Sequence, residues 1–432
     1  MNHATAADFP IRLGIGLLFL SLILGSSTPF ANPVWGQAVE NPPADQEPTT
    51  GKRSKRLVDN PYDFSQPPVL PDADVPSALD IQQSIDRGVE FLLENQRKTG
   101  AWGAATNTKD LNIYAPIPGA HDGFRMATTS LCITALLSVA VDDEARVNEA
   151  VDKAEAWLIE QLPSLKRATS DAIYNCWAHT YSIDALLALR KREGISETKK
   201  AKLDELIKSQ LKMLDAYESV DGGWGYYDFR YGGRKPTSSS TSFLNGATLV
   251  TMKRAADAGF EVNQKTVTRA IAATLRQQKP DFTYLYGEYL KTQPMRGINR
   301  PGGSLGRSQC CNVALRLWGD TEITDLVLEH WLVRLYERNG WLDMGRKRPV
   351  PHESWMGVAG YFYYFGHYYA GICIEQLPVA KRQPYQGLLA KLMLDRQEKD
   401  GSWWDYPLYN YHQPYGTAYA LLTLRNCLPS VK

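Results

Sequence analysis

Polar side chains that could perform chemistry gather in short segments along this chain. They combine histidines, acids, amides and tyrosines: His121, Asp122 and Arg125; Asp171, Tyr174, Asn175 and His179; residues 238–241 and Asn245; Arg307, Gln309 and Asn312; His352, Glu353 and Tyr361; Tyr409, His412 and Tyr415. Asp122, Asp171 and Glu353 are carboxylates that could act as general acid and base. The structural alternative is that such residues only cap helix N-termini, which Ser, Thr, Asp and Asn do well.

Most of these polar segments lead into stretches that are apolar on every side. The stretches 128–140, 182–189, 247–252 and 357–377 lack a polar face, which is typical of helices covered by other helices. Between them lie amphipathic stretches such as 145–160, with apolar Val147 and Leu158 and charged Asp152. No run of alternating β-branched residues competes with the helical periodicity. The sequence therefore predicts an all-α protein in which buried inner helices alternate with amphipathic outer helices.

A recurring turn sets the length of the repeating unit. Gln96, Glu218 and Gln397 each precede a Gly by four residues and a Trp by six, in Gly100-Ala101-Trp102, Gly222-Gly223-Trp224 and Gly401-Ser402-Trp403. A Gly can end a helix with a positive φ angle, and the following Trp can fold back to bury its ring. Weaker copies begin at Gln278, before Tyr284, at Leu335, before Trp341, and near Gln161. The steps between copies are 65, 57, 60, 57 and 62 residues, so we predict six repeats of two helices each.

These turns, together with helix openings such as residues 416–422, resemble those of the prenyltransferase and squalene-cyclase repeat superfamily. The resemblance covers residues 77–432 and implies an (α/α)6 toroid of about twelve helices. In such a toroid the N-terminal ends of the inner helices converge on one mouth of a central cavity. The resemblance implies a ligand that is an isoprenoid or a similar hydrophobic small molecule. Candidate ligand-binding residues are then His121, Arg125, Tyr174, His179, Gln309, Tyr361, Tyr364, Tyr368 and His412.

Two specific chemistries of the superfamily are incomplete here. Class II terpene cyclases use a D-x-D-D acid, but the nearest string, residues 140–143, lacks the first Asp and better fits a cap for the following helix. Protein prenyltransferases hold a catalytic zinc with Asp, Cys and His. Matching their motif places Cys311 and His367 on two zinc ligands and Gln309 on the Asp, whereas such sites normally need three protein ligands. A second metal option joins Cys176 and His179, one helical turn apart, with His121.

The ends and the composition limit the setting of the domain. Residues 13–25 form a short apolar run, followed by Gly36-Gln37-Ala38. This pattern predicts a signal peptide over residues 1–38, with an uncleaved N-terminal anchor as the alternative. Residues 39–76 are rich in Pro and predict an extended linker. We therefore expect an exported protein, periplasmic or extracellular.

The charge and the cysteines add two further expectations. The net charge of +1 gives no indication of a nucleic-acid partner. The six Cys lie in apolar helical contexts, which favours buried thiols, although export would permit disulfides. No oligomeric state follows from these features.

Three functional interpretations remain open at this stage. The toroid could bind or transform an isoprenoid or similar lipid, or it could be a non-catalytic binding or scaffold protein. The third interpretation is a carbohydrate-active (α/α)6 hydrolase or lyase that binds a glycan. In that case a pair among Asp122, Asp171, Glu353 and Asp405 would supply acid and base.

Overall fold

The computed structural model describes residues 63–105, 118–166, 172–173, 175–225, 227–228, 235–236 and 240–428. They all belong to one unit, Arg53–Lys432. The predicted signal peptide, most of the predicted linker, Asp171 and Tyr174 lie outside the described residues.

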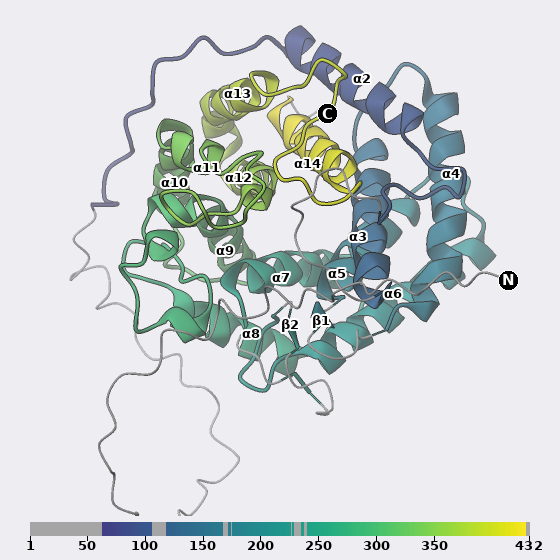
Figure 1. Ribbon diagram of the computed structural model, residues 1–432, viewed down its shortest axis with the longest axis horizontal. Helices are drawn as coiled ribbons and strands as arrows, with labels where there is room; N and C mark the ends of the chain where they lie inside the picture. Colours follow the sequence, from purple (N-terminus) through teal and green to yellow (C-terminus); the bar gives the residue numbers. More distant parts are fainter. Residues whose placement is uncertain are drawn as a thin grey trace, which may run out of the picture. The chain divides into compact units, whose positions relative to one another are not determined.

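Twelve long helices alternate between an inner and an outer ring in the described part of the chain (Figure 1). The inner helices are α3 (Pro118–Leu136), α5 (Cys176–Leu189), α7 (Ser242–Asp257), α9 (Leu305–Leu317), α12 (Tyr363–Glu375) and α14 (His412–Cys427). The outer helices are α2 (Ala78–Glu94), α4 (Glu144–Gln161), α6 (Glu197–Tyr217), α8 (Gln264–Gln277), α10 (Asp325–Glu337) and α13 (Val379–Leu394).

Short elements complete the connections. They are the helix α11 (Gly340–Asp343), the 3₁₀ turns η1 (Leu162–Ser164), η2 (Glu288–Leu290), η3 (Gly297–Asn299), η4 (Gly302–Ser304) and η5 (Gly360–Phe362), and the antiparallel strands β1 (Ala172–Ile173) and β2 (Tyr227–Asp228).

The inner helices close into a ring because each packs against the next one. α3 packs on α5, α5 on α7, α7 on α9, α9 on α12 and α12 on α14, and α14 packs back on α3. Each inner helix is also covered by an outer helix, as α5 is by α6. This packing explains why α5 and α12 are apolar all round and why nearly all their side chains are buried. The predicted (α/α)6 toroid is confirmed.

The outer helices carry the helix caps. The side chains of Ser77, Asp143, Ser196 and Thr324 each accept a hydrogen bond from the backbone N–H three residues later. Such a bond satisfies one of the unpaired donors at a helix start. Asp143 thus caps α4, as predicted from the sequence around it.

The turns that end with Trp102, Trp224 and Trp403 share one geometry. Each indole is fully buried. Its Nε1–H donates to a carbonyl ten residues earlier, in Leu92, Leu214 and Met393 respectively, at 2.8–2.9 Å. The backbone N–H of each Trp donates to a polar side chain of the following inner helix, from Thr129, Asn245 and Thr417. The turns therefore fix the position of an outer helix relative to the inner helix that follows it.

The Gly of each turn fixes the next outer helix as well. Gly100, Gly222 and Gly401 have positive φ angles of 91°, 93° and 84°. A Cβ at any of them would collide with a backbone carbonyl oxygen of the neighbouring outer helix, in Lys153, Arg269 and Arg87 respectively. The last of these contacts, between Gly401 and Arg87 of α2, joins the end of the ring to its beginning.

One of the weaker copies preserves this geometry and another does not. In the copy after α8, Phe282 takes the Gly position with a φ of 59°, and the N–H of Tyr284 donates to Ser304 Oγ as the Trp N–H groups do. Trp341 instead lies within α11 and is only partly buried. The expectation that Trp341 occupies an equivalent turn is wrong, because the chain continues as a short helix there.

Two general features of the described residues bear on the setting. None of their helices is long and apolar enough to cross a membrane. All six Cys are buried as free thiols, as the apolar sequence contexts predict.

Candidate functional site

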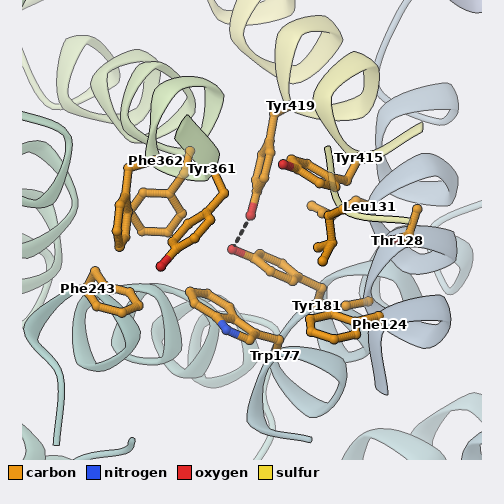
Figure 2. Close-up of a pocket in the computed structure, with 13 residues that line it drawn as sticks. Phe124, Thr128, Leu131, Trp177, Tyr181, Phe243, Tyr361, Phe362, Tyr415 and Tyr419 are labelled. Atoms are coloured by element: carbon orange, nitrogen blue, oxygen red, sulfur yellow. Dashed lines mark hydrogen bonds between the residues drawn. The ribbon is translucent and has the colours of Figure 1, made fainter. Parts of the chain in front are cut away.

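The inner helices enclose an apolar cavity near their N-terminal ends (Figure 2). Its volume is about 130 Å³, close to the ~150 Å³ of an apolar cavity that binds benzene. Nine of its 13 lining side chains are aromatic. The lining comprises Phe124, Ala127, Thr128 and Leu131 of α3, Trp177 and Tyr181 of α5, Phe243 of α7, Tyr361, Phe362 and Phe365 around the start of α12, and Leu408, Tyr415 and Tyr419 before and within α14.

Helical spacing brings these rings together. Trp177 and Tyr181, four residues apart on α5, stack with their ring centroids 5.7 Å apart. Phe243 of α7 meets Phe362 edge-on at 4.8 Å. Because residues four apart share a helix face, each inner helix presents paired rings to the cavity. The cavity therefore suits an apolar group.

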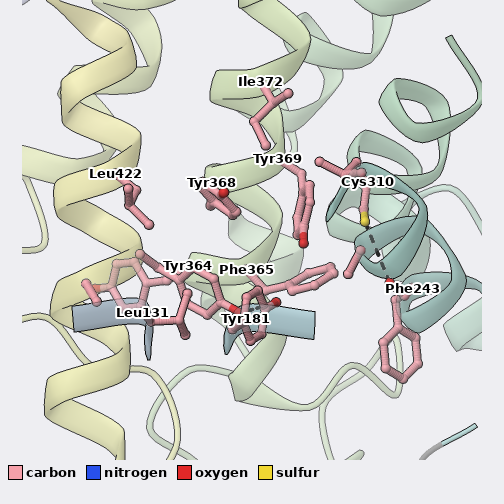
Figure 3. Close-up of a cluster of buried hydrophobic side chains, with 14 of the residues drawn as sticks. Leu131, Tyr181, Phe243, Cys310, Tyr364, Phe365, Tyr368, Tyr369, Ile372 and Leu422 are labelled. Atoms are coloured by element: carbon pink, nitrogen blue, oxygen red, sulfur yellow. Dashed lines mark hydrogen bonds between the residues drawn. The ribbon is translucent and has the colours of Figure 1, made fainter. Parts of the chain in front are cut away.

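A layer of tyrosines closes the inner end of the cavity. The hydroxyl of Tyr419 donates to that of Tyr181 at 2.5 Å. Tyr368 lies against Tyr419 with the ring centroids 5.5 Å apart and against Tyr369 at 4.9 Å (Figure 3). Burial raises the pKa of Tyr368 to about 12. These phenols are consequently neutral at physiological pH.

One buried acid stands behind the cavity wall. Asp405 has no exposed surface. Its Oδ1 accepts a hydrogen bond of 2.5 Å from the hydroxyl of cavity-lining Tyr415, and its Oδ2 accepts one of 3.3 Å from the N–H of Tyr364. Burial raises the pKa of Asp405 to about 7, although the bond from Tyr415 acts in the opposite direction. Asp405 is thus a weak acid that reaches the cavity only through Tyr415.

Polar residues lie at the same end of the ring on two sides. On one side His121 packs edge-on against Tyr409 at 4.7 Å, and Tyr411 lies against cavity-lining Phe124 at 5.9 Å. On the other side His352 Nδ1 hydrogen-bonds the carbonyl of Gly357 at 2.7 Å, and its ring meets that of Tyr361.

Backbone strain marks the same region. Tyr409 and His352 have positive φ angles, 47° and 63°. Residues in such conformations persist only where the surroundings hold them and are common at functional sites.

The polar residues that begin inner helices are not simply helix caps. No side chain makes a capping hydrogen bond at the starts of α5, α7, α9, α12 or α14. Several have a different structural task, since Asn245, Ser304 and Thr417 receive the backbone N–H groups of the turns described above.

The structure separates the predicted ligand-binding residues. Tyr361 lines the cavity, and His121 lies beside it with partly buried Arg125. His179 and Gln309 instead face outer helices, bonding to Gln210 of α6 and to the carbonyl of Trp331 of α10. Their assignment to the cavity is wrong, because their side chains leave the opposite face of the inner helices.

The remaining predicted binding residues lie around the cavity rather than in its lining. Tyr364 packs beside Asp405 and Tyr368 belongs to the tyrosine layer. His412 bonds to the carbonyl of Tyr409 and packs on Trp404.

The proposed carboxylates have different environments. Asp122 is exposed at the start of α3. Glu353 is also exposed and lies 3.7 Å from Arg348. Neither carboxylate lines the aromatic cavity. Asp171 lies outside the described residues.

The proposed zinc ligands face different neighbours. The Cys311 thiol donates to the carbonyl of Ser242 of α7, and burial raises its pKa to about 12. Both ring nitrogens of His367 are engaged, with Asn339 at 2.8 Å and with the carbonyl of Tyr363 at 2.7 Å. No three His, Cys, Asp or Glu side chains of the described residues form a group that could hold a metal. The residues present therefore do not fit a zinc site.

The closed ring and its aromatic cavity define an α/α toroid. Residues 69–294, more than half of the 432, match the squalene-hopene cyclase C-terminal domain family, and the chain belongs to this family. No match was found among curated proteins.

Solved structures show the same fold at low identity. One is the type II terpene cyclase MstE from Scytonema, in complex with geranylgeranyl dihydroxybenzoate, at 12% identity and a TM-score of 0.46 over 81% of this chain and 96% of that one. Another is an inactive variant of the α-1,6-mannanase GH76A from Salegentibacter sp. HEL1_6, in complex with α-1,6-mannotetrose. It has 9% identity and a TM-score of 0.50 over 80% of this chain and 98% of that one. At these identities the likeness concerns the fold alone.

Sequence reasoning missed several residues of the cavity. Trp177, Tyr181, Phe243 and Tyr419 line it but were not proposed as ligand-binding. Their signal was present as aromatic pairs four residues apart, at 177 and 181, 361 and 365, and 415 and 419. Such pairs near the starts of inner helices indicate the face that meets the central cavity.

Proposed function

We propose that this protein is exported and that its aromatic cavity binds the apolar end of an isoprenoid or a similar lipid. The observation that carries the proposal is the apolar cavity with nine aromatic side chains among its 13 lining residues. Membership of a family named for a squalene cyclase supports this class of ligand.

The size of the cavity limits what it takes up. A volume of about 130 Å³ accommodates one ring or one branched end group, whereas drug-sized ligands occupy roughly 300–1,000 Å³. We therefore propose that only the end of the ligand enters the cavity. The remainder lies toward the polar side chains around His121 and His352.

The chemistry of the cavity favours binding over cyclisation started by protonation. A proton donor to an alkene must be a strong acid. Asp405 is the buried acid next to the cavity, and its pKa is raised to about 7 rather than lowered. Asp143, from the string nearest to the D-x-D-D motif, caps α4 instead. We propose binding without a protonation step.

Export is a proposal from the sequence alone. The signal peptide over residues 1–38 and the linker over residues 39–76 would deliver the toroid to the periplasm or the extracellular space.

Calorimetric titration with farnesol and geranylgeraniol tests the binding proposal. Ala127 lines the cavity, so Ala127→Leu adds three heavy atoms inside it and should weaken binding by on the order of tenfold or more. Ala258→Leu makes the same change at the opposite end of the ring and should leave binding unaltered. Absence of binding to the wild-type protein, or equal binding by both variants, would favour the scaffold interpretation.

A further inference from the structure

A second, polar cavity lies at the opposite end of the inner ring. It has a volume of about 830 Å³ and is lined by the C-terminal halves of α3, α5, α7, α12 and α14. We call it the basin. Its charged lining residues are Asp184, Lys191, Arg192, Arg254, Asp257, Glu375 and Arg425. Its volume lies within the usual range for small-molecule sites, about 300–1,000 Å³.

The tyrosine layer separates the basin from the aromatic cavity. Tyr368 lines the basin, whereas Tyr181 and Tyr419 line the cavity. Tyr368 and Tyr419 are in ring contact at 5.5 Å. The two cavities therefore lie back to back on one layer of side chains and are distinct sites.

Arg254 is held in a fixed orientation in the basin. Its Nη1 donates to Asp184 Oδ2 at 3.1 Å and to the hydroxyl of Tyr368 at 2.8 Å. Asp184 is itself buried and accepts a further bond of 2.9 Å from Thr251. Because both contacts use Nη1, the edge formed by Nε and Nη2 has no partner among the described residues. The side chain of Arg254 keeps 34% of its surface exposed, and this edge is the one that binds carboxylate and phosphate groups in a bidentate manner.

The other charges of the basin are mostly neutralised by neighbours. Arg425 pairs with Glu375 at 2.9 Å, and Arg192 pairs with Asp152 at 2.6 Å. Asp257 pairs with Lys253. Exposed Lys191 forms no ion pair among the described residues. The cationic groups without a counter-charge are thus the open edge of Arg254 and Lys191.

The surroundings of these two cations also favour hydroxyl groups. Five inner helices end around the basin, and helix C-termini carry partial negative charge. A bare inorganic anion meets that negative potential, whereas a hydroxyl-rich anion can donate hydrogen bonds to it. We propose that the basin binds a small, hydroxyl-rich anion, such as a sugar acid or a sugar phosphate, through the Nε–Nη2 edge of Arg254 with support from Lys191. This site is independent of the lipid site proposed above.

Calorimetric titration of the full-length mature protein tests this proposal. The probes are glucuronate, glucose 6-phosphate and, as the neutral control, glucose. We expect at least one of the two anions to bind on the order of tenfold more tightly than glucose. Which of them binds distinguishes a carboxylate ligand from a phosphate ligand.

Matched variants assign the binding to the basin. Arg254→Lys keeps the charge opposite Asp184 but removes the bidentate edge, and we expect it to weaken binding by about tenfold. Lys191→Gln changes an exposed residue without affecting the fold and should also weaken binding, whereas Lys208→Gln on the exposed face of α6 should not. The proposal is overturned if neither anion binds the wild-type protein, if glucose binds as tightly, or if Arg254→Lys and Lys191→Gln both bind as the wild type does.

Discussion

At the scale of single residues, burial determines what the polar groups of this protein can do. His179 and His367 each have a pKa lowered to about 4, mainly because they are buried. Both are therefore neutral structural side chains at physiological pH. Asp405 shifts in the opposite direction for the same reason, because burial disfavours the charged form of an acid as well as that of a base.

The raised pKa of Asp405 predicts a pH dependence of stability. Its pKa rises from about 3.8 in the unfolded chain to about 7 in the folded one. Between these values the folded state holds a proton that the unfolded state has lost, so the free energy of unfolding falls as the pH rises from 4 to 7. Asp405→Asn removes this contribution.

Urea denaturation at several pH values measures the effect. The lowered pKa values of His179 and His367 act in the opposite direction, so the comparison of the variant with the wild type isolates Asp405. Relative to the wild type, the variant should gain stability steadily from pH 4 to pH 7. A difference that stays constant over this interval would show that Asp405 is ionised throughout.

The sequence predicted some site residues and not others for a definite reason. Tyr361 and His121 were found because they stand in loops and first turns, where the polar side chains are few and conspicuous. His179 and Gln309 were misplaced because inner helices are apolar all round. No polar face then tells which side of such a helix meets the cavity and which meets the outer ring.

At the scale of elements, the turns that contain Gly and Trp hold neighbouring repeats together. Gln96 Nε2 donates to the carbonyls of Gly100 and of Ala150 in α4, and Gln397 Nε2 does the same with Gly401 and with Ser84 in α2. One side chain thus joins its own turn to the next outer helix. The sequence allowed this turn to be predicted because its spacing recurs. It did not show that Trp341 belongs to a separate short helix.

A matched pair of glycines tests the role of these turns. Gly401 and Gly259 have similar positive φ angles, 84° and 88°. A Cβ at Gly401 would collide with the carbonyl of Arg87, whereas at Gly259 it would meet no atom within 4 Å. Gly259→Ala should cost about 1 kcal/mol through its backbone conformation alone. Gly401→Ala should cost roughly 1–3 kcal/mol more through overpacking. Equal free energies of unfolding for the two variants would contradict a tight contact between this turn and α2.

At the scale of the whole toroid, the closed inner ring creates two different environments at its two ends. The N-terminal ends of the inner helices hold the aromatic cavity, and their C-terminal ends hold the charged basin. The tyrosine layer between them keeps the apolar volume at about 130 Å³. The repeat spacing was sufficient to predict the ring. It could not predict this layer, since the aromatic stretch 361–369 fits core packing and a ligand surface equally well.

The central claim is that the aromatic cavity is occupied by the end of a lipid in the exported protein. Native mass spectrometry of the protein purified from its own compartment tests this most directly, with the wild type and Ala127→Leu side by side. We expect a polypeptide that begins near Val39 and carries an isoprenoid or similar lipid, and we expect the variant to have lost that lipid. A wild-type protein without a bound lipid, or a lipid retained equally by Ala127→Leu, would contradict the claim.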